Sequence, residues 1–403
     1  MLFNLAVITI AALLMNRIFE LIKLPGLLGM ILTGIVLGPY CLDFISPLLL
    51  NISAELRTAA LIVILIRAGL GINRETLNKI GIPALKMSCI PGIFEGLTVM
   101  LVAHHLLSLP WLEAGMLGFI IAAVSPAVVV PQMLELKKHG FGQNREVPTL
   151  LLAGASLDNI FAITIFGIFL SLFCDAGQNI MSIAVKLPLG IIAGLALGLL
   201  AGYLLSGLFK RFEMRDTKKM IVFLVAAILL NSLESFKSIR NILPVASLLG
   251  VMAMGFVLLE KNNDTANRLA SKFGKVWVFA EILLFVLIGA QVNISVALNA
   301  GLIGGLIILI GLAGRSAGVW LALFRTKLNP HEKLFCVLAY FPKATVQAAI
   351  GAIPLACGVK SGETILAIAV FSIILTSPLG AILITRTSRT LLKKHPADSS
   401  KAD

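Results

Sequence analysis

The chain alternates long apolar runs with short charged segments. Most runs are about 20 residues long, the length of helix that crosses the hydrocarbon core of a bilayer. Their hydrophobic positions lack the two-residue alternation of a membrane β-strand. The pattern predicts an all-α polytopic membrane protein with about thirteen transmembrane helices. The expected spans cover residues 2–19, 25–48, 53–72, 82–108, 112–134, 147–174, 182–209, 219–236, 241–260, 275–296, 298–324, 334–356 and 364–386.

Basic residues gather in every second loop and in the C-terminal tail. An excess of Lys and Arg marks the cytoplasmic side of a membrane protein. We therefore expect these loops and the C-terminus in the cytoplasm, and the N-terminus outside. The net charge of +13 follows from this topology. The expected partner is the lipid bilayer, and no nucleic acid is expected.

Prolines interrupt two of the apolar runs. The segment SPAVVVP (125–131) places Pro126 and Pro131 in the fifth span, and FPKATVQAAIGAIP (341–354) places Pro342 in the twelfth. Proline removes a backbone donor, and irregular backbone at membrane depth is tolerated where it is buried in protein or lines a wet cavity. Two interrupted spans in comparable places of two halves indicate the midplane site of a secondary transporter. A simple proline kink is the alternative for either span.

Asp158 lies near the middle of the sixth apolar run. A carboxylate at that depth costs roughly 2.5–3.5 kcal/mol on insertion scales, so it needs a cationic partner, a bound cation or a proton. Other ionisable residues in apolar runs could neutralise one another in pairs. They are Arg67, Glu95, Glu281, Arg315 and Lys343. For Arg67 and Glu281, a structural ion pair or a position at the membrane interface is as good an explanation as a role in transport. We interpret Asp158 and Lys343 as functional, because each lies in or beside an interrupted segment.

Oxygen atoms near these positions suit a monovalent cation. Ser125, Asn159 and Thr345, with backbone carbonyls freed by the interruptions, could surround Na⁺ or Li⁺ at Asp158. All five histidines lie in loops or at span ends, which argues against a transition-metal site. The sequence contains no phosphate-binding loop, catalytic triad or paired catalytic carboxylates. We expect neither an enzyme nor a cofactor.

Three segments resemble the signature stretches of the monovalent cation/proton antiporters. They are AAVSPAVVVPQMLEL (122–136), VPTLLLAGASLDNIFAITIF (147–166) and AYFPKATVQAAIGAIPLA (339–356). The similarity is greatest to the NHA-type sodium/proton branch, and it covers nearly the whole chain. It implies an inverted repeat, a homodimer, and two broken helices that cross near the ion-binding carboxylates. It also implies that Arg315 and Lys343 balance the charge of the crossing, with Glu95 as a partner of Arg315.

The resemblance further implies a core domain that moves against a dimerisation domain. The corresponding division has six segments. They are scaffold or dimerisation helices (1–80), the first half of the core (81–180), a linker helix (181–210), further scaffold helices (211–272), the second half of the core (273–387) and a cytoplasmic tail (388–403).

The chain departs from that branch at one position. Two adjacent aspartates are usual in the sixth span, and here the pair is Asp158–Asn159. Asparagine can coordinate a cation through its carbonyl oxygen, but it cannot carry a proton. We therefore expect alternating access with Asp158 binding either H⁺ or a cation (Na⁺ or Li⁺, with K⁺ as a further candidate). One-for-one electroneutral exchange across a bacterial plasma membrane is the simplest form. Symport of an organic anion on the same scaffold, or a relative that has lost transport through Asn159, are the alternatives.

Overall fold

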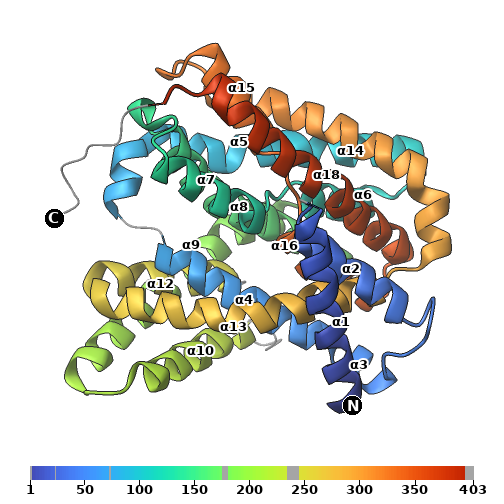
Figure 1. Cartoon of the computed structure of the whole chain (residues 1–403), viewed down its shortest axis with the longest axis horizontal. Coiled ribbons are helices and arrows are strands. Elements are labelled where there is room, and N and C mark those ends of the chain that lie inside the picture. The colour runs from blue at the N-terminus through green and yellow to red at the C-terminus, as the bar shows by residue number, and fades with distance from the viewer. Residues whose placement is uncertain (1, 23, 72–73, 175–179, 234–244, 395–403) are drawn as a thin grey trace. The chain divides into compact units, whose positions relative to one another are not determined.

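The computed structural model describes the chain except residues 1, 23, 72–73, 175–179, 234–244 and 395–403. The described residues are helical apart from turns, loops and one antiparallel bridge between Phe141 and Lys394 (Figure 1). The all-α polytopic fold is therefore confirmed. The predicted tail lies largely outside the described residues, as do the start of the predicted span 241–260 and the end of 219–236.

Seven stretches of the described helices are long and apolar enough to cross a membrane. They are Leu2–Leu21, Gly81–Leu107, Val147–Cys174, Leu189–Arg211, Asn263–Ala290, Gly301–Ala322 and Gly362–Leu391. Shorter apolar helices account for several further predicted spans, at Gly26–Leu37, Trp111–Ile121 and Thr345–Ala356. The total of thirteen spans and the inverted repeat stay predictions.

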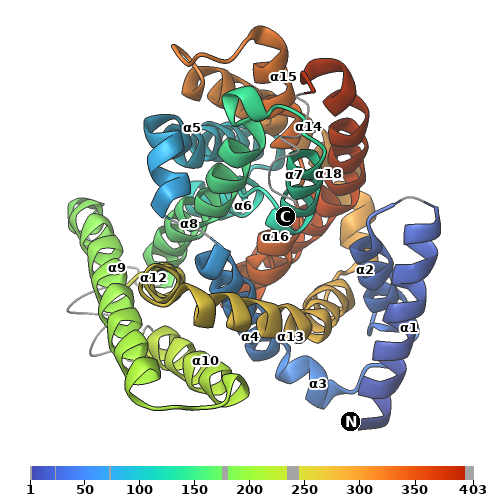
Figure 2. The ribbon, with the colours of Figure 1, turned by 60° about the vertical axis from the view of Figure 1, so that its left-hand side comes forward.

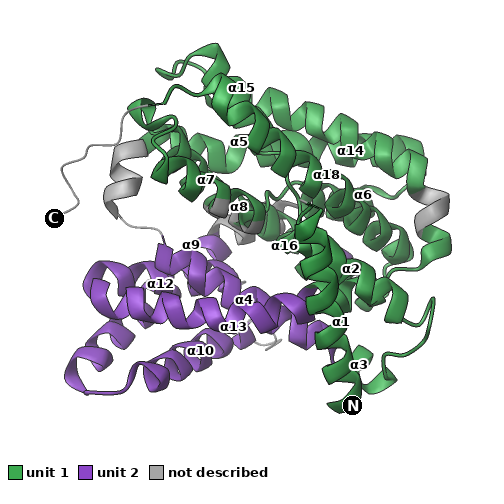
Figure 3. Ribbon diagram, viewed as in Figure 1, with its two compact units in different colours: residues 1–50, 78–169, 285–403 green, residues 51–77, 170–284 purple. Residues whose placement is uncertain are grey.

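The chain forms two compact units (Figure 3). Unit 1 contains Met1–Leu50, Asn78–Phe169 and Phe285–Asp403, and unit 2 contains Asn51–Leu77 and Leu170–Leu284. The division into scaffold and core segments stays a prediction. Its boundary between residues 272 and 273 falls within α13 (Asn263–Ala290), which is continuous there.

Unit 2 packs its helices through glycines. It contains α4 (Ser53–Gly71), α9 (Ile180–Arg211), α10 (Asp216–Ser232), α12 (Ser247–Lys261) and most of α13. Helix α12 lies against α9 and α4. A Cβ atom added at Gly198 of α9 would lie 2.1 Å from the carbonyl oxygen of Gly250, and one at Gly69 of α4 would lie 2.3 Å from that of Met252. Small residues let helix backbones approach this closely in a membrane.

Gly198→Ala is expected to destabilise unit 2, because the new methyl group has to push two helix backbones apart. Overpacking of this kind costs about 1–3 kcal/mol. Gly207→Ala, on the same helix, is the matched control, because nothing lies within 4 Å of its added Cβ atom. The control should be neutral or slightly stabilising, since alanine favours a helix over glycine. Thermal unfolding of the two purified variants in detergent measures the difference, and equal melting temperatures would contradict the packing described.

Unit 1 is centred on α18 (Gly362–Leu391), which contacts α6, α7, α14, α15, α16 and α17 (Figures 1 and 2). The other helices of the unit are α1 (Leu2–Leu21), α2 (Gly26–Leu37), α3 (Pro47–Asn51), most of α5 (Arg74–Leu107), α6 (Trp111–Ile121), α7 (Pro126–Lys138), the 3₁₀ turn η1 (Gln143–Arg145), most of α8 (Val147–Cys174), α14 (Ile294–Ala322), α15 (Pro330–Ala339), α16 (Thr345–Ile350) and α17 (Ile353–Ala356).

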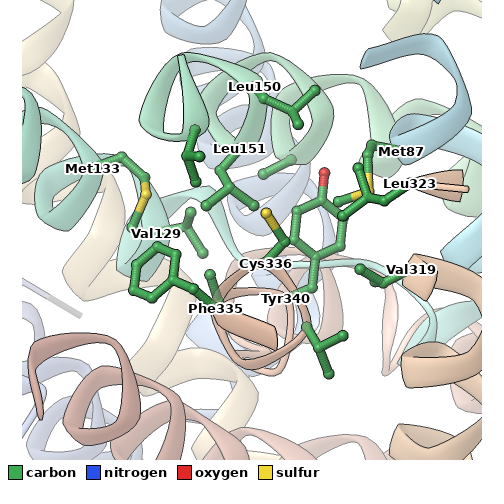
Figure 4. Packing of buried hydrophobic residues seen from close by; sticks show 14 of the residues in the cluster. Met87, Val129, Met133, Leu150, Leu151, Val319, Leu323, Phe335, Cys336 and Tyr340 are labelled. Atoms are coloured by element: carbon green, nitrogen blue, oxygen red, sulfur yellow. The ribbon is translucent and has the colours of Figure 1, made fainter. Parts of the chain in front are cut away.

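A hydrophobic cluster joins α5, α7, α8, α14 and α15 within this unit. Figure 4 shows the ring of Tyr340 among Met87, Cys336 and Val319, with its hydroxyl group directed toward the helix that carries Leu150. These residues are fully or almost fully buried. Close packing of this kind holds the helices around the two interruptions in fixed positions.

Both predicted interruptions are confirmed. In the fifth predicted span, α6 ends at Ile121 and α7 begins at Pro126. In the twelfth, α15 ends at Ala339 and α16 begins at Thr345. A residue before proline is steered away from helical backbone angles, and Ser125 accordingly has extended angles (φ −86°, ψ 110°). Proline then fits the first position of a helix, where its missing N–H group has no helical partner in any case.

The prediction that Pro131 takes part in the interruption is wrong. Helix α7 continues through this residue to Lys138. The break lies at residues 122–125, on the N-terminal side of Pro126. Proline inside a helix removes one hydrogen bond, and a buried helix tolerates this loss where its other contacts hold the backbone in place.

Candidate ion-binding site

The two interruptions lie against each other. The backbone N–H of Ser125 donates a hydrogen bond of 2.9 Å to the carbonyl oxygen of Pro342. The side chain of Gln347, in α16, donates to carbonyl oxygens at the end of α6. We call this region, residues 120–126 with 340–347, the crossing.

Asp158 reaches the crossing from α8. Its side chain is completely buried. Its Oδ2 atom accepts hydrogen bonds from Nη2 of Arg315 and from the backbone N–H of Val124, each at 2.9 Å. Its Oδ1 atom has no hydrogen-bond partner among the described residues. One oxygen of this carboxylate is thus held in place, and the other can bind a further group.

Two acids and two bases form one buried network at the crossing. Arg315 of α14, which donates to Asp158 through Nη2, also donates through Nη1. The acceptors of Nη1 are Oε2 of Glu95, on α5, and the carbonyl oxygen of Ala122. Lys343 donates through Nζ to the same Glu95 oxygen at 2.6 Å. All four charged side chains have no exposed surface. The pairing of Glu95 with Arg315 implied by the resemblance is present, and the formal charges of the network cancel.

The other expected ligand residues are buried at or near the crossing. Ser125 is fully buried and Asn159 is 4% exposed, and neither Oγ of Ser125 nor Oδ1 of Asn159 has a hydrogen-bond partner in the described part of the chain. Thr345 is 1% exposed and is the first residue of α16. A Cβ atom added at Gly92 would lie 3.0 Å from Oδ1 of Asp158, so a side chain at this position would crowd that oxygen.

The expectation that freed backbone carbonyls serve as ion ligands stays a prediction, and those at the end of α6 also have side-chain partners. The carbonyl oxygens of Ile120, Ile121 and Ala123 accept hydrogen bonds from Gln347, and that of Ala122 accepts one from Arg315. Buried carbonyls rarely lack a partner, and here side chains from distant helices provide it. A carbonyl oxygen has two lone pairs, so one accepted hydrogen bond leaves it able to bind a cation as well.

Two residues of the crossing were not identified from the sequence, Gln347 and Tyr340. The guanidinium carbon of Arg315 lies 5.2 Å from the centre of the Tyr340 ring, within the range of a cation–π contact. The Tyr340 hydroxyl lies beside α8, where a Cβ atom added at Gly154 would be 2.0 Å away. A polar residue in an apolar run, such as glutamine in ATVQAA, is the signal that could have indicated Gln347.

The remaining membrane charges that we predicted lie outside the crossing. Arg67 is in α4, and its guanidinium carbon is 5.8 Å from the centre of the Trp277 ring of α13. Glu281 is also in α13. Within the described residues, no group of three or more His, Cys, Asp or Glu side chains is arranged to hold a metal ion. The atoms available to coordinate an ion at the crossing are oxygens, and oxygen ligands suit hard monovalent cations.

Comparison with known proteins identifies the family. Residues 5–390 match the family described as "Sodium/hydrogen exchanger, transmembrane". Human sodium/hydrogen exchanger 9B2 is 34% identical over 98% of this chain and 75% of its own length. Human sodium/hydrogen exchanger 9B1 is 31% identical over 98% of this chain and 79% of its own length.

A solved structure shows the same fold. The sodium proton antiporter MjNhaP1 from Methanocaldococcus jannaschii, at pH 8, matches with a TM-score of 0.81 over 96% of both chains, at 20% sequence identity. The match of nearly the whole chain to one family of membrane transporters agrees with the buried carboxylate and the two interrupted helices. The chain belongs to the sodium/hydrogen exchanger family.

Proposed function

We propose that this protein exchanges a monovalent cation for H⁺ across a membrane, with Asp158 as the residue that binds both in turn. The observation that carries the proposal is the state of the Asp158 carboxylate. Its Oδ2 atom is held by Arg315 and Val124, and its Oδ1 atom is buried without a hydrogen-bond partner among the described residues. A buried polar oxygen is costly unless another group satisfies it. A proton or a small cation such as Na⁺ or Li⁺ would do so, and K⁺ is the further candidate.

Competition for one carboxylate is sufficient to couple the two fluxes. If Asp158 binds either H⁺ or the cation, but never both, each ion that enters requires the other to leave. The oxygens of Ser125 and Asn159 would complete the coordination of the cation, with Thr345 beside them. Glu95, Arg315 and Lys343 would hold the network together and balance its charge. The two loaded forms then carry the same net charge, so exchange is one-for-one and electroneutral.

The site requires movement for ions to reach it, because Asp158 has no exposed surface. We assign that movement to the core segments 81–180 and 273–387, which contain every charged residue of the crossing. Segments 1–80 and 211–272 would form the scaffold and the homodimer contact, and 181–210 would link the two. We propose a bacterial plasma membrane as the location. The basic residues in every second loop favour a cytoplasmic C-terminus and an outer N-terminus.

Symport of an organic anion has less support. Such a substrate would need a cationic group to bind its carboxylate. In the described part of the crossing, Arg315 and Lys343 both donate to Glu95, and Arg315 also to Asp158. The sequence relatives are named as sodium/hydrogen exchangers. Both observations favour a cation as the substrate.

A vesicle assay tests the proposed exchange and its stoichiometry. Purified protein in liposomes with an acid interior and a trapped pH dye should give an alkaline shift when NaCl or LiCl alone is added outside. The rate should not change when K⁺ and valinomycin impose a membrane potential. Asn159→Asp is the informative contrast, because a second titratable carboxylate allows two protons per cation and so a potential-dependent rate. A wild-type protein that moves protons only with an organic anion, or not at all, would overturn the proposal.

A further inference from the structure

Gln347 connects the two interrupted helices through a single side chain. It lies on α16 and is completely buried. Its Nε2 atom donates to the carbonyl oxygens of Ile120 at 2.9 Å, Ile121 at 3.3 Å and Ala123 at 2.9 Å. These acceptors are more than 220 residues away in the sequence. Three carbonyls thus converge on one amide group.

The acceptors are groups that the break in the chain leaves without helical partners. The last carbonyls of a helix have no donor within the helix, and they carry the negative end of its dipole. The nearby Asp158 carboxylate is also negative, and the Arg315 guanidinium is the positive charge beside both. Donors that satisfy the end of α6 therefore reduce its repulsion of Asp158. Arg315 does so at Ala122, and Gln347 does so at the carbonyls on either side.

The last of these peptide groups also contacts Asp158 directly. The carbonyl of Ala123 belongs to the same peptide unit as the N–H of Val124, and that N–H donates to Oδ2 of Asp158 at 2.9 Å. A peptide unit is planar, so an acceptor held on one edge fixes the direction of the donor on the other. Gln347 and Asp158 thus hold opposite edges of one peptide group.

We propose that Gln347 is a positioning residue for exchange. It keeps the Val124 N–H group directed at Asp158 and joins the ends of α6 and α16 so that they move together. The amide fits this role because the three carbonyls fix its orientation. Its Nε2 faces the acceptors, and its Oε1 has no hydrogen-bond partner among the described residues. The inference rests on the proposed role of Asp158.

Two substitutions of similar size separate this role from simple packing. Gln347→Met removes the donors, so Asp158 should bind cations less well. We expect the apparent KM for Na⁺ in liposomes to rise about tenfold, equivalent to one lost hydrogen bond, with maximal rate changed less than about threefold. A role in folding alone would lower the amount of active protein, and so the maximal rate, without changing KM. Thr33→Val is the control, because it removes a buried hydroxyl that donates within α2, to the carbonyl oxygen of Gly29.

Gln347→Glu provides a second and independent measurement. A protonated glutamate keeps one O–H donor for the α6 carbonyls, whereas an ionised one repels them. The ratio of variant to wild-type rate should therefore increase as the pH is lowered. Both proteins contain the same four charged residues at the crossing, Glu95, Asp158, Arg315 and Lys343. Division by the wild-type rate at each pH therefore removes the effect of their titration. This measurement also applies if the methionine variant does not fold.

The outcomes separate this inference from the proposed function. A wild-type KM in Gln347→Met, or a pH-independent rate ratio in Gln347→Glu, would overturn the positioning role. The proposed function would still stand if the wild type exchanges ions and an Asp158→Asn variant does not. Absence of exchange in the wild type, or full activity in Asp158→Asn, would instead refute the proposed function.

Discussion

Asp158→Asn will abolish cation-dependent proton movement in liposomes. An amide has nearly the same shape as a carboxylate but binds no proton. Its oxygen can still accept hydrogen bonds from Arg315 and Val124, so the crossing keeps most of its contacts. What the variant loses is the charge for which the cation and the proton compete. We expect no proton movement above that of protein-free liposomes, because coupled exchange needs a group that binds both ions in turn.

The same variant should lose its response to cations in a binding measurement. A ligand that binds only the folded protein raises its stability, by about 2.7 kcal/mol at a concentration 100 times its Kd. Wild-type protein should therefore melt at a higher temperature in NaCl or LiCl than in choline chloride, and Asp158→Asn should not. Asp216→Asn is the matched control. It makes the same chemical change at a carboxylate in unit 2, which pairs at 3.0 Å with Arg268. Exchange by Asp158→Asn at the rate of this control would place the ion-binding carboxylate elsewhere.

Arg315→Met will cause the largest loss of stability among single changes at the crossing. The network then keeps Glu95 and Asp158 with only Lys343 to balance them. Removal of one partner from a buried ion pair typically costs 3–5 kcal/mol, because an uncompensated charge stays buried. The substitution also removes the donor to the Ala122 carbonyl. We expect a much lower melting temperature and poor accumulation in the membrane.

A double variant tests whether charge is the cause. Arg315→Met combined with Glu95→Gln restores neutrality, since Asp158 and Lys343 remain. The double variant should be more stable than Arg315→Met alone, so the two effects should be strongly non-additive. Arg315→Lys should fall between wild type and Arg315→Met, because lysine keeps the charge but lacks the planar fork that binds two acids at once. Simple addition of the two single effects would refute a shared electrostatic network.

The sequence by itself determined the class of the fold and the position of its chemistry. The sixth predicted span and α8 have the same bounds, Val147–Cys174. The break before Pro126 was evident, because a proline acts on its neighbours through local sterics. Asp158 and Lys343 were identifiable, since a charge in an apolar run needs a compensating partner wherever the chain takes it.

Only the tertiary structure decided which groups satisfy one another at the crossing. No local rule indicates that Gln347 donates to α6, that Arg315 joins two carboxylates, or that Tyr340 lies beneath Arg315. The partners are separated by more than 150 residues in both ion pairs, and packing alone brings them together. The carbonyls at the end of α6 therefore accept hydrogen bonds from side chains of distant helices. Hydropathy and proline act over a few residues, whereas hydrogen-bond partners are chosen among all groups that the fold brings within reach.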